Sequence, residues 1–310
     1  MRIGIVTPAF NVAPYIGDAV RSVLAQTHQD WAMTIVDDGS TDDTAAIASG
    51  FDDPRVRLIR QSNVGVSAAR NRGLRATNAA AILFLDGDDW LSPDALSNLK
   101  AALQTDPNAV AAVGPYVRMS SSGANSGRVM RPASGDLLES LLVRNLFANG
   151  GHLLIHRVVL DATGPFHPGL RYGEDWEYWT RMARLGWFTT TPERAPLLFV
   201  RERHDGAYLG MATSPEAFAP CMDAIFNAPG LKARFSVREL AGLRRHAAAE
   251  NDWIVGRELL RHGRRDEGRH FLRRAVATAP SFKRVVLLAA GSLPLIRVGP
   301  FRSYPAPGSA

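Results

Sequence analysis

Short apolar runs alternate with segments of helical spacing through about the first hundred residues of the chain. The runs are four or five residues long and rich in Val, Ile, Leu and Ala, which is typical of strands buried on both faces of a parallel sheet. The predicted strands are residues 3–6, 32–36, 56–59 and 81–85, and the predicted helices between them are residues 16–24, 41–49 and 67–76. Strands that alternate with helices pair in parallel through crossover connections, so the pattern predicts an α/β fold.

Further helical signals follow the fourth predicted strand. Ser92 is the expected N-cap of a further helix, with Pro93 at its first position. After about residue 110 the pattern is mixed, residues 172–185 have helical spacing, and from about residue 235 onward the chain favours helix throughout. We therefore predict two parts, an α/β unit over residues 1–230 and a helical C-terminal extension over residues 231–310.

The helical extension resembles one hairpin of the tetratricopeptide type, in which two amphipathic helices are split near Gly263. The residues that carry this resemblance are Trp253, Gly256, Leu259, Gly263, Gly268, Leu272, Ala275 and Pro280. A single unit cannot form a solenoid, so we expect the hairpin to pack on the α/β unit as structural support. A role in binding another protein is the alternative.

Charge is distributed unevenly between these two parts. The whole chain has a formal net charge of +6, but residues 231–310 hold 16 Lys and Arg against 6 Asp and Glu. No basic surface with interleaved aromatic residues is apparent, so we expect no nucleic-acid partner. An anionic membrane surface fits the basic extension equally well. Cys221 is the only cysteine, which suits a reducing compartment and a thiol without a catalytic role.

Membrane attachment is a hypothesis that depends on residues 282–296, which are strongly apolar and flanked by basic residues. They include Pro294 and are too short to span a bilayer, and the start of the chain shows no signal peptide. A helix of this kind can lie in a membrane interface, or it can cover an apolar patch on the α/β unit. We expect a cytoplasmic protein, with the inner face of the membrane as the location that the first interpretation favours.

Polar, turn-forming residues follow three of the predicted strands. Thr7 and Pro8 follow the first, Asp37, Asp38 and Gly39 the second, and the run Asp-Gly-Asp-Asp at residues 86–89 the fourth. The carboxyl ends of parallel strands share one edge of the sheet, where ligands of open α/β folds bind. Three clustered carboxylates repel one another, and a hard divalent cation such as Mg²⁺ or Mn²⁺ would relieve that repulsion. A solvated turn that caps the next helix is the alternative for residues 86–89, and an Asx turn for residues 37–40.

Five motifs occur in the order and spacing of glycosyltransferase family 2. The motifs are Thr-Pro-Ala-Phe-Asn at residues 7–11, Val-Asp-Asp-Gly-Ser-Thr-Asp at 36–42, Asn-Val-Gly at 63–65, Ala-Ala-Arg-Asn-Arg-Gly at 68–73 and Phe-Leu-Asp-Gly-Asp-Asp at 84–89. The chain resembles the catalytic domain of this family from residue 1 to roughly 205. The resemblance implies the type A glycosyltransferase fold, a Rossmann-like, mostly parallel mixed sheet flanked by helices. It also implies a nucleotide-sugar donor, a divalent cation and inversion at the anomeric carbon.

The resemblance also assigns roles to individual residues. Asp86 is expected at the ribose and Asp88 at the Mn²⁺ or Mg²⁺ ion that bridges the diphosphate, while Asp89 supports the turn. A cation there would stabilise the charge that grows on the leaving nucleoside diphosphate. The remaining donor-site residues, expected around the base, the ribose and the sugar, are Thr7, Pro8, Ala9, Asp38, Arg70 and Gly87.

Two further residues are candidates, one for the general base and one for the metal ion. Asp175, in the run Gly-Glu-Asp-Trp at residues 173–176, matches the general base of the family. The alternative is that acids there only favour a helix N-terminus. His204 lies in a basic segment, where a metal ligand and a surface histidine are equally supported. His152 has no clear partner in the sequence, and we expect no function for it.

The resulting hypothesis is an inverting glycosyltransferase that moves a sugar, first of all from a UDP-sugar, to a hydroxyl of a glycan or lipid-linked acceptor. A catalytically silent nucleotide-sugar-binding or scaffold protein is the alternative, and the intact Asp86, Asp88 and Asp175 argue against it. A nucleotidyltransferase would need a Gly-rich basic loop after the first strand, and residues 7–11 do not form one. The sequence identifies neither the sugar, nor the acceptor, nor the oligomeric state.

Overall fold

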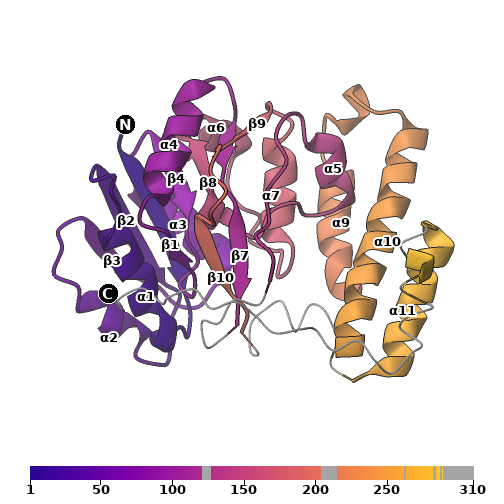
Figure 1. Ribbon diagram of the computed structural model, residues 1–310, viewed down its shortest axis with the longest axis horizontal. Coiled ribbons are helices and arrows are strands. Elements are labelled where there is room, and N and C mark those ends of the chain that lie inside the picture. The colour runs from indigo at the N-terminus through magenta and orange to yellow at the C-terminus, as the bar shows by residue number, and fades with distance from the viewer. Residues whose placement is uncertain (121–126, 204–214, 262, 282–283, 287, 289–310) are drawn as a thin grey trace.

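The computed structural model describes the whole chain except residues 121–126, 204–214, 262, 282–283, 287 and 289–310. Its main element is a seven-stranded sheet in the order β3-β2-β1-β4-β8-β6-β9 (Figure 1). The four strands β3, β2, β1 and β4 are parallel to one another, and β8 is antiparallel to both of its neighbours. The strands are β1 (Ile3–Ala9), β2 (Trp31–Asp37), β3 (Val56–Arg60), β4 (Ala81–Phe84), β6 (Ala111–Val113), β8 (Leu153–His156) and β9 (Phe188–Thr190).

A second sheet of three short strands in the order β5-β10-β7 adjoins the first. Strand β10 runs antiparallel to β5 and parallel to β7. The aromatic rings of Trp90 and Phe199 stack across the pair β5 and β10, with centroids 5.3 Å apart. These strands are β5 (Trp90–Leu91), β7 (Tyr116–Met119) and β10 (Leu198–Arg201).

Helices cover both faces of the main sheet, because successive side chains of a strand point to opposite faces. Ile3 and Ile5 of β1 lie in one buried cluster with α1 and α4, whereas Val6 lies in a second cluster with α3, α5, α7, α9 and α10. Figure 1 shows α7, α5, α9 and α10 on the same side of the sheet, with α11 beyond α10. The helices are α1 (Ala13–Leu24), α2 (Thr44–Ser49), α3 (Val66–Ala76), α4 (Ala95–Thr105), α5 (Leu138–Val143), α6 (Arg157–Thr163), α7 (Glu174–Met182), α9 (Ala219–Phe226), α10 (Val237–Arg261) and α11 (Arg265–Thr278), with 3₁₀ turns η1 (Gly150–His152), η2 (Pro215–Phe218) and η3 (Leu231–Ala233).

The α/β class and its mostly parallel mixed sheet are confirmed, and the differences concern boundaries. Strand β1 extends to Ala9, because its last three residues still pair with β2. Helix α4 begins at Ala95, two residues later than the position of Pro93 suggested. Helix α2 begins at Thr44 because Asp42 binds the backbone and hydroxyl of Thr44 and forms a turn there.

The helical extension forms the predicted hairpin. Helices α10 and α11 are separated near Gly263, which has a φ of 78°. A Cβ atom on Gly256 would lie 2.9 Å from the carbonyl oxygen of Gly268, so glycine permits the two helix backbones to approach closely. Helix α10 also places Leu240 and Val255 in the cluster that contains α5 and α7. The described part of the chain contains no helix that is long and apolar enough to cross a membrane.

Candidate active site

The ends of β1, β2 and β4 meet at one edge of the sheet, as their parallel direction predicts. The backbone N–H of Asp38 donates to the carbonyl oxygen of Ala9 over 2.8 Å. A Cβ atom on Gly87 would lie 3.2 Å from the carbonyl oxygen of Pro8 and 3.1 Å from Val12 Cγ2, so the turn after β4 fits closely against the end of β1. Four predicted donor-site residues are therefore neighbours in space, namely Pro8, Ala9, Asp38 and Gly87.

Asp38 is buried, and its carboxylate shapes the loop that precedes α3. It accepts hydrogen bonds from Gln61 Nε2 over 2.6 Å and from the backbone N–H groups of Val64 and Gly65 over 3.1 and 2.8 Å. The role of Asp38 at the base or ribose stays a prediction. Asp38 holds the Asn-Val-Gly motif in place at the edge of the sheet.

Thr7 lies within β1 with an exposed fraction of 0%. Its hydroxyl Oγ1 has no hydrogen-bond partner among the described residues, and the same holds for Ser67 Oγ at the start of α3. Buried polar atoms normally have a hydrogen-bond partner. These two hydroxyls are therefore unusual, and they lie near the edge of the sheet where ligands of open α/β folds bind.

The residues of the Asp-Gly-Asp-Asp run at positions 86–89, which follows β4, lie in different environments. Asp89 is buried, and its carboxylate accepts from the backbone N–H of Arg201 over 2.8 Å and from Asn149 Nδ2 over 2.5 Å. Burial, together with the charges of Asp88 and Asp86, raises the pKa of Asp89 well above its usual range. Asp89 therefore supports the structure beyond its own turn, because it joins that turn to β10 and to the segment before η1.

Asp86 and Asp88 keep partly exposed carboxylates, each 24% exposed. Burial and the neighbouring charge of Asp86 raise the pKa of Asp88. A cation would relieve this cost, and carboxylate oxygens are the ligands that Mg²⁺ prefers, often only one or two of them together with substrate phosphates. No set of three or more His, Cys, Asp or Glu side chains converges on a metal position within the described residues. The carboxylates of Asp86 and Asp88 therefore fit a metal ion whose other ligands include a substrate diphosphate.

Arg70 connects the acidic run at residues 86–89 to α7. Its guanidinium is 5% exposed and forms ion pairs with Asp86 Oδ1 and Glu174 Oε1, each over 2.9 Å. Burial opposes its charge, but the carboxylates of Asp86 and Glu174 outweigh burial and raise the pKa of Arg70 above its usual value. Arg70 thus brings residues 86 and 174 together although 88 positions separate them in the sequence. The sequence placed Arg70 near the donor but gave no role to Glu174.

Asp175 is half-buried at the beginning of α7. It accepts a hydrogen bond from Asn145 Nδ2 over 3.1 Å and one from the backbone N–H of Trp176 over 2.6 Å. Burial and the charge of Glu174 raise the pKa of Asp175 to about 7, although Arg70 opposes this effect. A carboxylate with such a pKa is suited to accept a proton near neutral pH. Asn145 belongs to no motif, so no pattern in the sequence indicated its role.

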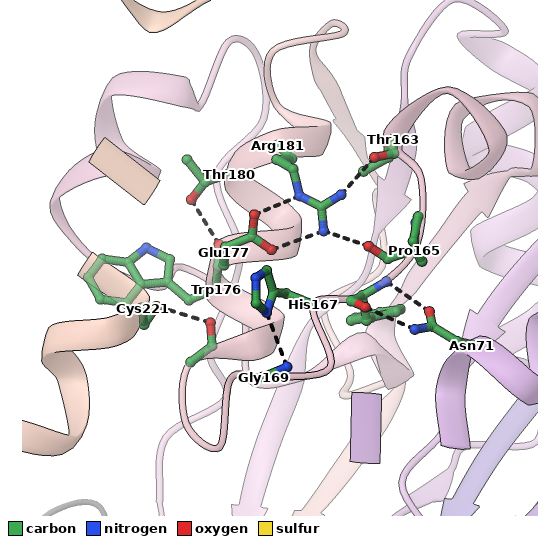
Figure 2. A network of polar contacts seen from close by, with 12 residues as sticks. Asn71, Thr163, Pro165, His167, Gly169, Trp176, Glu177, Thr180, Arg181 and Cys221 are labelled. Atoms are coloured by element: carbon green, nitrogen blue, oxygen red, sulfur yellow. Dashed lines mark hydrogen bonds and ion pairs between the residues drawn. The ribbon is translucent and has the colours of Figure 1, made fainter. Parts of the chain in front are cut away.

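Helix α7 is fixed on its outer side by Arg181 (Figure 2). This side chain pairs with Glu177 one turn earlier, over 2.6 Å, and donates to the carbonyl oxygens of Thr163 and Pro165 over 2.7 and 2.9 Å. The segment after α6 is thereby attached to α7. Asp175 lies at the other end of this helix.

Cys221 on α9 supports the beginning of α7. Its thiol donates to the carbonyl oxygen of Gly173 over 3.1 Å (Figure 2), and Gly173 has a φ of 71°, which favours glycine. Burial raises the pKa of Cys221, so the thiol stays protonated. The expected absence of a nucleophilic role agrees with this environment.

His152 is fully buried and structural, as expected. Its Nδ1 lies 2.8 Å from the carbonyl oxygen of Gly114, and its Nε2 accepts from the backbone N–H of Ala148 over 3.2 Å. These partners assign the neutral tautomer that carries its proton on Nδ1. Burial lowers the pKa of His152 to about 4, so the ring is neutral at physiological pH.

Two arginines at the end of β10 lie beside the acidic run. Arg201 donates through Nε to the carbonyl oxygen of Asp88 over 3.0 Å and forms an ion pair with Asp18 over 2.9 Å. Arg203 forms an ion pair with Asp88 Oδ2 over 3.2 Å. The sequence indicated a basic segment here but not these partners. His204, the predicted second metal ligand, lies outside the described residues.

The sequence profile of glycosyl transferase family 2 matches residues 4–163, which is more than half of the chain. The chain belongs to glycosyl transferase family 2. The match to this family begins in β1 and ends with α6, so it contains Arg70, Asp86 and Asp88. It stops before Asp175, whose place at the site comes from the structure.

Curated relatives are similar over part of the chain. The glycosyltransferase GlyA of Streptococcus pneumoniae is 34% identical over 123 residues, which cover 39% of this chain and 18% of GlyA. Chondroitin synthase of Escherichia coli is 44% identical over 96 residues, which cover 30% of this chain and 14% of the synthase. The chain thus matches less than a fifth of the length of each of these relatives.

Solved structures of glycosyltransferases share the fold over nearly the whole chain. The S. aureus TarS fragment 1–349 in complex with UDP-GlcNAc has a TM-score of 0.59 at 17% identity and covers 93% of this chain and 84% of its own. The mannosyltransferase PcManGT of Pyrobaculum calidifontis, in complex with GDP-Man and Mn²⁺, has a TM-score of 0.55 at 18% identity and covers 94% and 79%. At these identities the likeness establishes the fold alone, and it is the type A fold that the sequence motifs implied.

Proposed function

We propose that this protein is an inverting glycosyltransferase that moves a sugar from a nucleoside diphosphate sugar to a hydroxyl of a glycan or lipid-linked acceptor. The observation that carries the proposal is the pair of Arg70 contacts. Asp86, which we propose for the donor, and Glu174, the neighbour of Asp175, contact the same guanidinium although they come from different motifs. This closeness supports the proposal, because a single-displacement transfer needs the donor and the base near one another.

Asp175 is the proposed general base. In an inverting transfer the acceptor hydroxyl attacks the anomeric carbon from the side opposite the leaving diphosphate. The carboxylate takes the hydroxyl proton as the new C–O bond forms and the bond to the diphosphate breaks. Asn145 Nδ2, 3.1 Å from Asp175 Oδ2, orients the carboxylate, and the hydrogen bond from the Trp176 N–H fixes the other oxygen.

The proposed metal residue is Asp88, with Asp86 at the ribose. A bound Mn²⁺ or Mg²⁺ would stabilise negative charge on the leaving diphosphate. Asp38 keeps the 61–65 loop in place, and Thr7, with its unpaired hydroxyl, lies on the strand between Asp38 and the acidic turn. Asp89 stays outside the reaction because its carboxylate is buried and joins the acidic turn to Arg201 and Asn149.

A UDP-sugar is the donor that we propose first. The TarS fragment binds UDP-GlcNAc, and PcManGT binds GDP-Man with Mn²⁺, so the shared fold accommodates both nucleotides in other proteins. Chondroitin synthase makes a polysaccharide by its name, which supports a glycan acceptor. The sequence of this chain favours neither nucleotide.

A screen of nucleotide-sugars by thermal shift, each with Mn²⁺, tests the proposed donor. The bound donor stabilises the folded chain by mass action, by about 2.7 kcal/mol at a hundredfold excess over Kd. We expect one nucleotide-sugar to raise the melting temperature clearly more than the others, and the rise to disappear with EDTA. If no UDP-, GDP-, dTDP- or CMP-sugar shifts the melting temperature, the chain is not a nucleotide-sugar enzyme.

Transfer should depend on pH through Asp175. The base acts as a carboxylate, and its pKa is raised to about 7, so the active form is lost as the pH falls. We expect kcat/KM to fall by about tenfold for each pH unit below 7 and to level off above it. Donor binding measured over the same range controls for effects on the donor site. A rate that stays flat down to pH 5 would contradict the assignment of the base.

Peripheral attachment to an anionic membrane is the proposed location, and it depends on residues 282–296. Within the described part of this stretch, Val285 and Val286 are 48% and 45% exposed, and Arg284 pairs with Glu250 on α10. We expect the full chain, but not a chain truncated after Ser281, to sediment with vesicles that contain phosphatidylserine. Equal sedimentation of the two chains would show that this stretch does not bind the membrane.

A further inference from the structure

Arg203 occupies the carboxylate that we assign to the metal ion. Its Nη1 lies 3.2 Å from Asp88 Oδ2, and its Nη2 donates to the carbonyl oxygen of Asn11 over 3.4 Å. The guanidinium carbon lies 5.3 Å from the centre of the Tyr15 ring. The side chain is 12% exposed, so this positive charge is held inside the site rather than in bulk solvent.

The neighbouring Arg201 has a different function, because its contacts hold it in a fixed position. It pairs with Asp18, and its guanidinium carbon lies 4.7 Å from the ring centres of both Tyr15 and Trp90. It reaches the backbone oxygen of Asp88 rather than the carboxylate. Arg203 is therefore the arginine that meets the Asp88 carboxylate, and it does so through one long contact instead of a bidentate pair.

We propose that Arg203 is an internal competitor of the metal ion, one that holds Asp88 before the ion binds and keeps the affinity for the free ion low. The proposal rests on the proposed function, since it takes Asp88 as the metal residue. A divalent ion needs a carboxylate oxygen at about 2.1 Å and repels a guanidinium held against the same carboxylate. The single contact of 3.2 Å is weaker than a bidentate pair, so the ion can replace it.

A diphosphate changes this balance. Once displaced from Asp88, the guanidinium of Arg203 can contact the phosphates that share the ion, because they are anionic. The metal ion and the nucleotide therefore strengthen each other's binding, and this coupling acts equally in both directions. The protein would bind the metal ion weakly when no donor is bound and tightly when the donor is present.

Direct titration with Mn²⁺ tests the proposal without any activity assay. Calorimetry would compare the wild type with Arg203→Gln, Arg203→Lys and Asp88→Ala, first without nucleotide and then with saturating UDP. The matched control is Arg244→Gln, which removes an arginine from an exposed pair with Asp223 on the helical extension. Melting temperatures would verify that each variant is folded.

We expect Arg203→Gln to bind free Mn²⁺ about tenfold more tightly than the wild type, and Arg203→Lys, which keeps the charge, to remain near the wild type. With UDP present the advantage of Arg203→Gln should disappear, because the displaced guanidinium then has the phosphates. A free-Mn²⁺ affinity of Arg203→Gln equal to or below that of the wild type would overturn the inference alone. If Asp88→Ala binds Mn²⁺ as the wild type does, the metal assignment in the proposed function fails, and the inference fails with it.

Discussion

The Asp175→Asn enzyme is expected to bind the donor as well as the wild type and to lose transfer. Asparagine has nearly the same shape as the carboxylate and can keep a hydrogen bond with Asn145, but it cannot take a proton. Loss of a general base costs about a hundredfold to ten-thousandfold in rate. Hydrolysis of the donor by water gives a readout that needs no known acceptor, and it should fall in parallel with transfer.

The control for this substitution is Asp161→Asn on α6, where the carboxylate is 58% exposed and forms an ion pair with Arg157. It makes the same chemical change on the surface, and we expect wild-type rates from it. Donor binding, measured by thermal shift with Mn²⁺, should be equal in all three proteins. If Asp175→Asn retains the full rate, another group is the base. If the wild type binds the donor but shows no turnover at all, the catalytically silent alternative is favoured.

Asp88→Ala is expected to lose both the metal-dependent part of donor binding and turnover. The substitution removes the carboxylate proposed for the ion, together with its ion pair to Arg203. Stabilisation of the leaving diphosphate by a metal ion contributes several kcal/mol, so we expect at least about a thousandfold loss of rate. The measurement is donor binding with Mn²⁺ and with EDTA, followed by donor hydrolysis.

Asp52→Ala is the matched control for Asp88→Ala, because Asp52 is an exposed aspartate that lies between α2 and β3. It should behave as the wild type in both assays. Asp88→Ala and Asp175→Asn also differ from each other in a useful way. Asp88→Ala loses donor binding and rate together, whereas Asp175→Asn loses rate alone, so the pair separates the donor site from the base. Metal-dependent donor binding that survives in Asp88→Ala would show that the ion is held elsewhere.

The donor edge was predictable because it depends on local pattern and chain direction. Apolar runs identify β1, β2 and β4, and parallel strands must end on the same side. The place of Asp38 and Gly87 follows from that rule alone. The boundaries followed less well, since the pairing of β1 with β2 extends the strand to Ala9 and overrides the turn that Pro8 suggested.

The contacts across the site could not be predicted in the same way. Arg70 meets Glu174 across 104 positions, and Asp88 meets Arg203 across 115. Such pairs result from the packing of α3 against β1 and of β10 beside the acidic turn, which no short pattern records. Asn145 illustrates the limit, because it lies in an irregular segment after α5 and becomes relevant only when α7 packs beside it.

Helix α10 has a consequence for how the protein unfolds. Leu240, Ala247 and Val255 share one buried cluster with Leu141 of α5 and Trp179 of α7, so the helical extension and the sheet are stabilised by the same apolar contacts. The boundary near residue 230 therefore separates two kinds of sequence, and we infer that both sides unfold as one cooperative unit. A chain cut before α10 would expose a face of α5 to water and would be prone to aggregate. The extension that carries none of the proposed catalytic residues is, in this sense, a condition for the active site to exist.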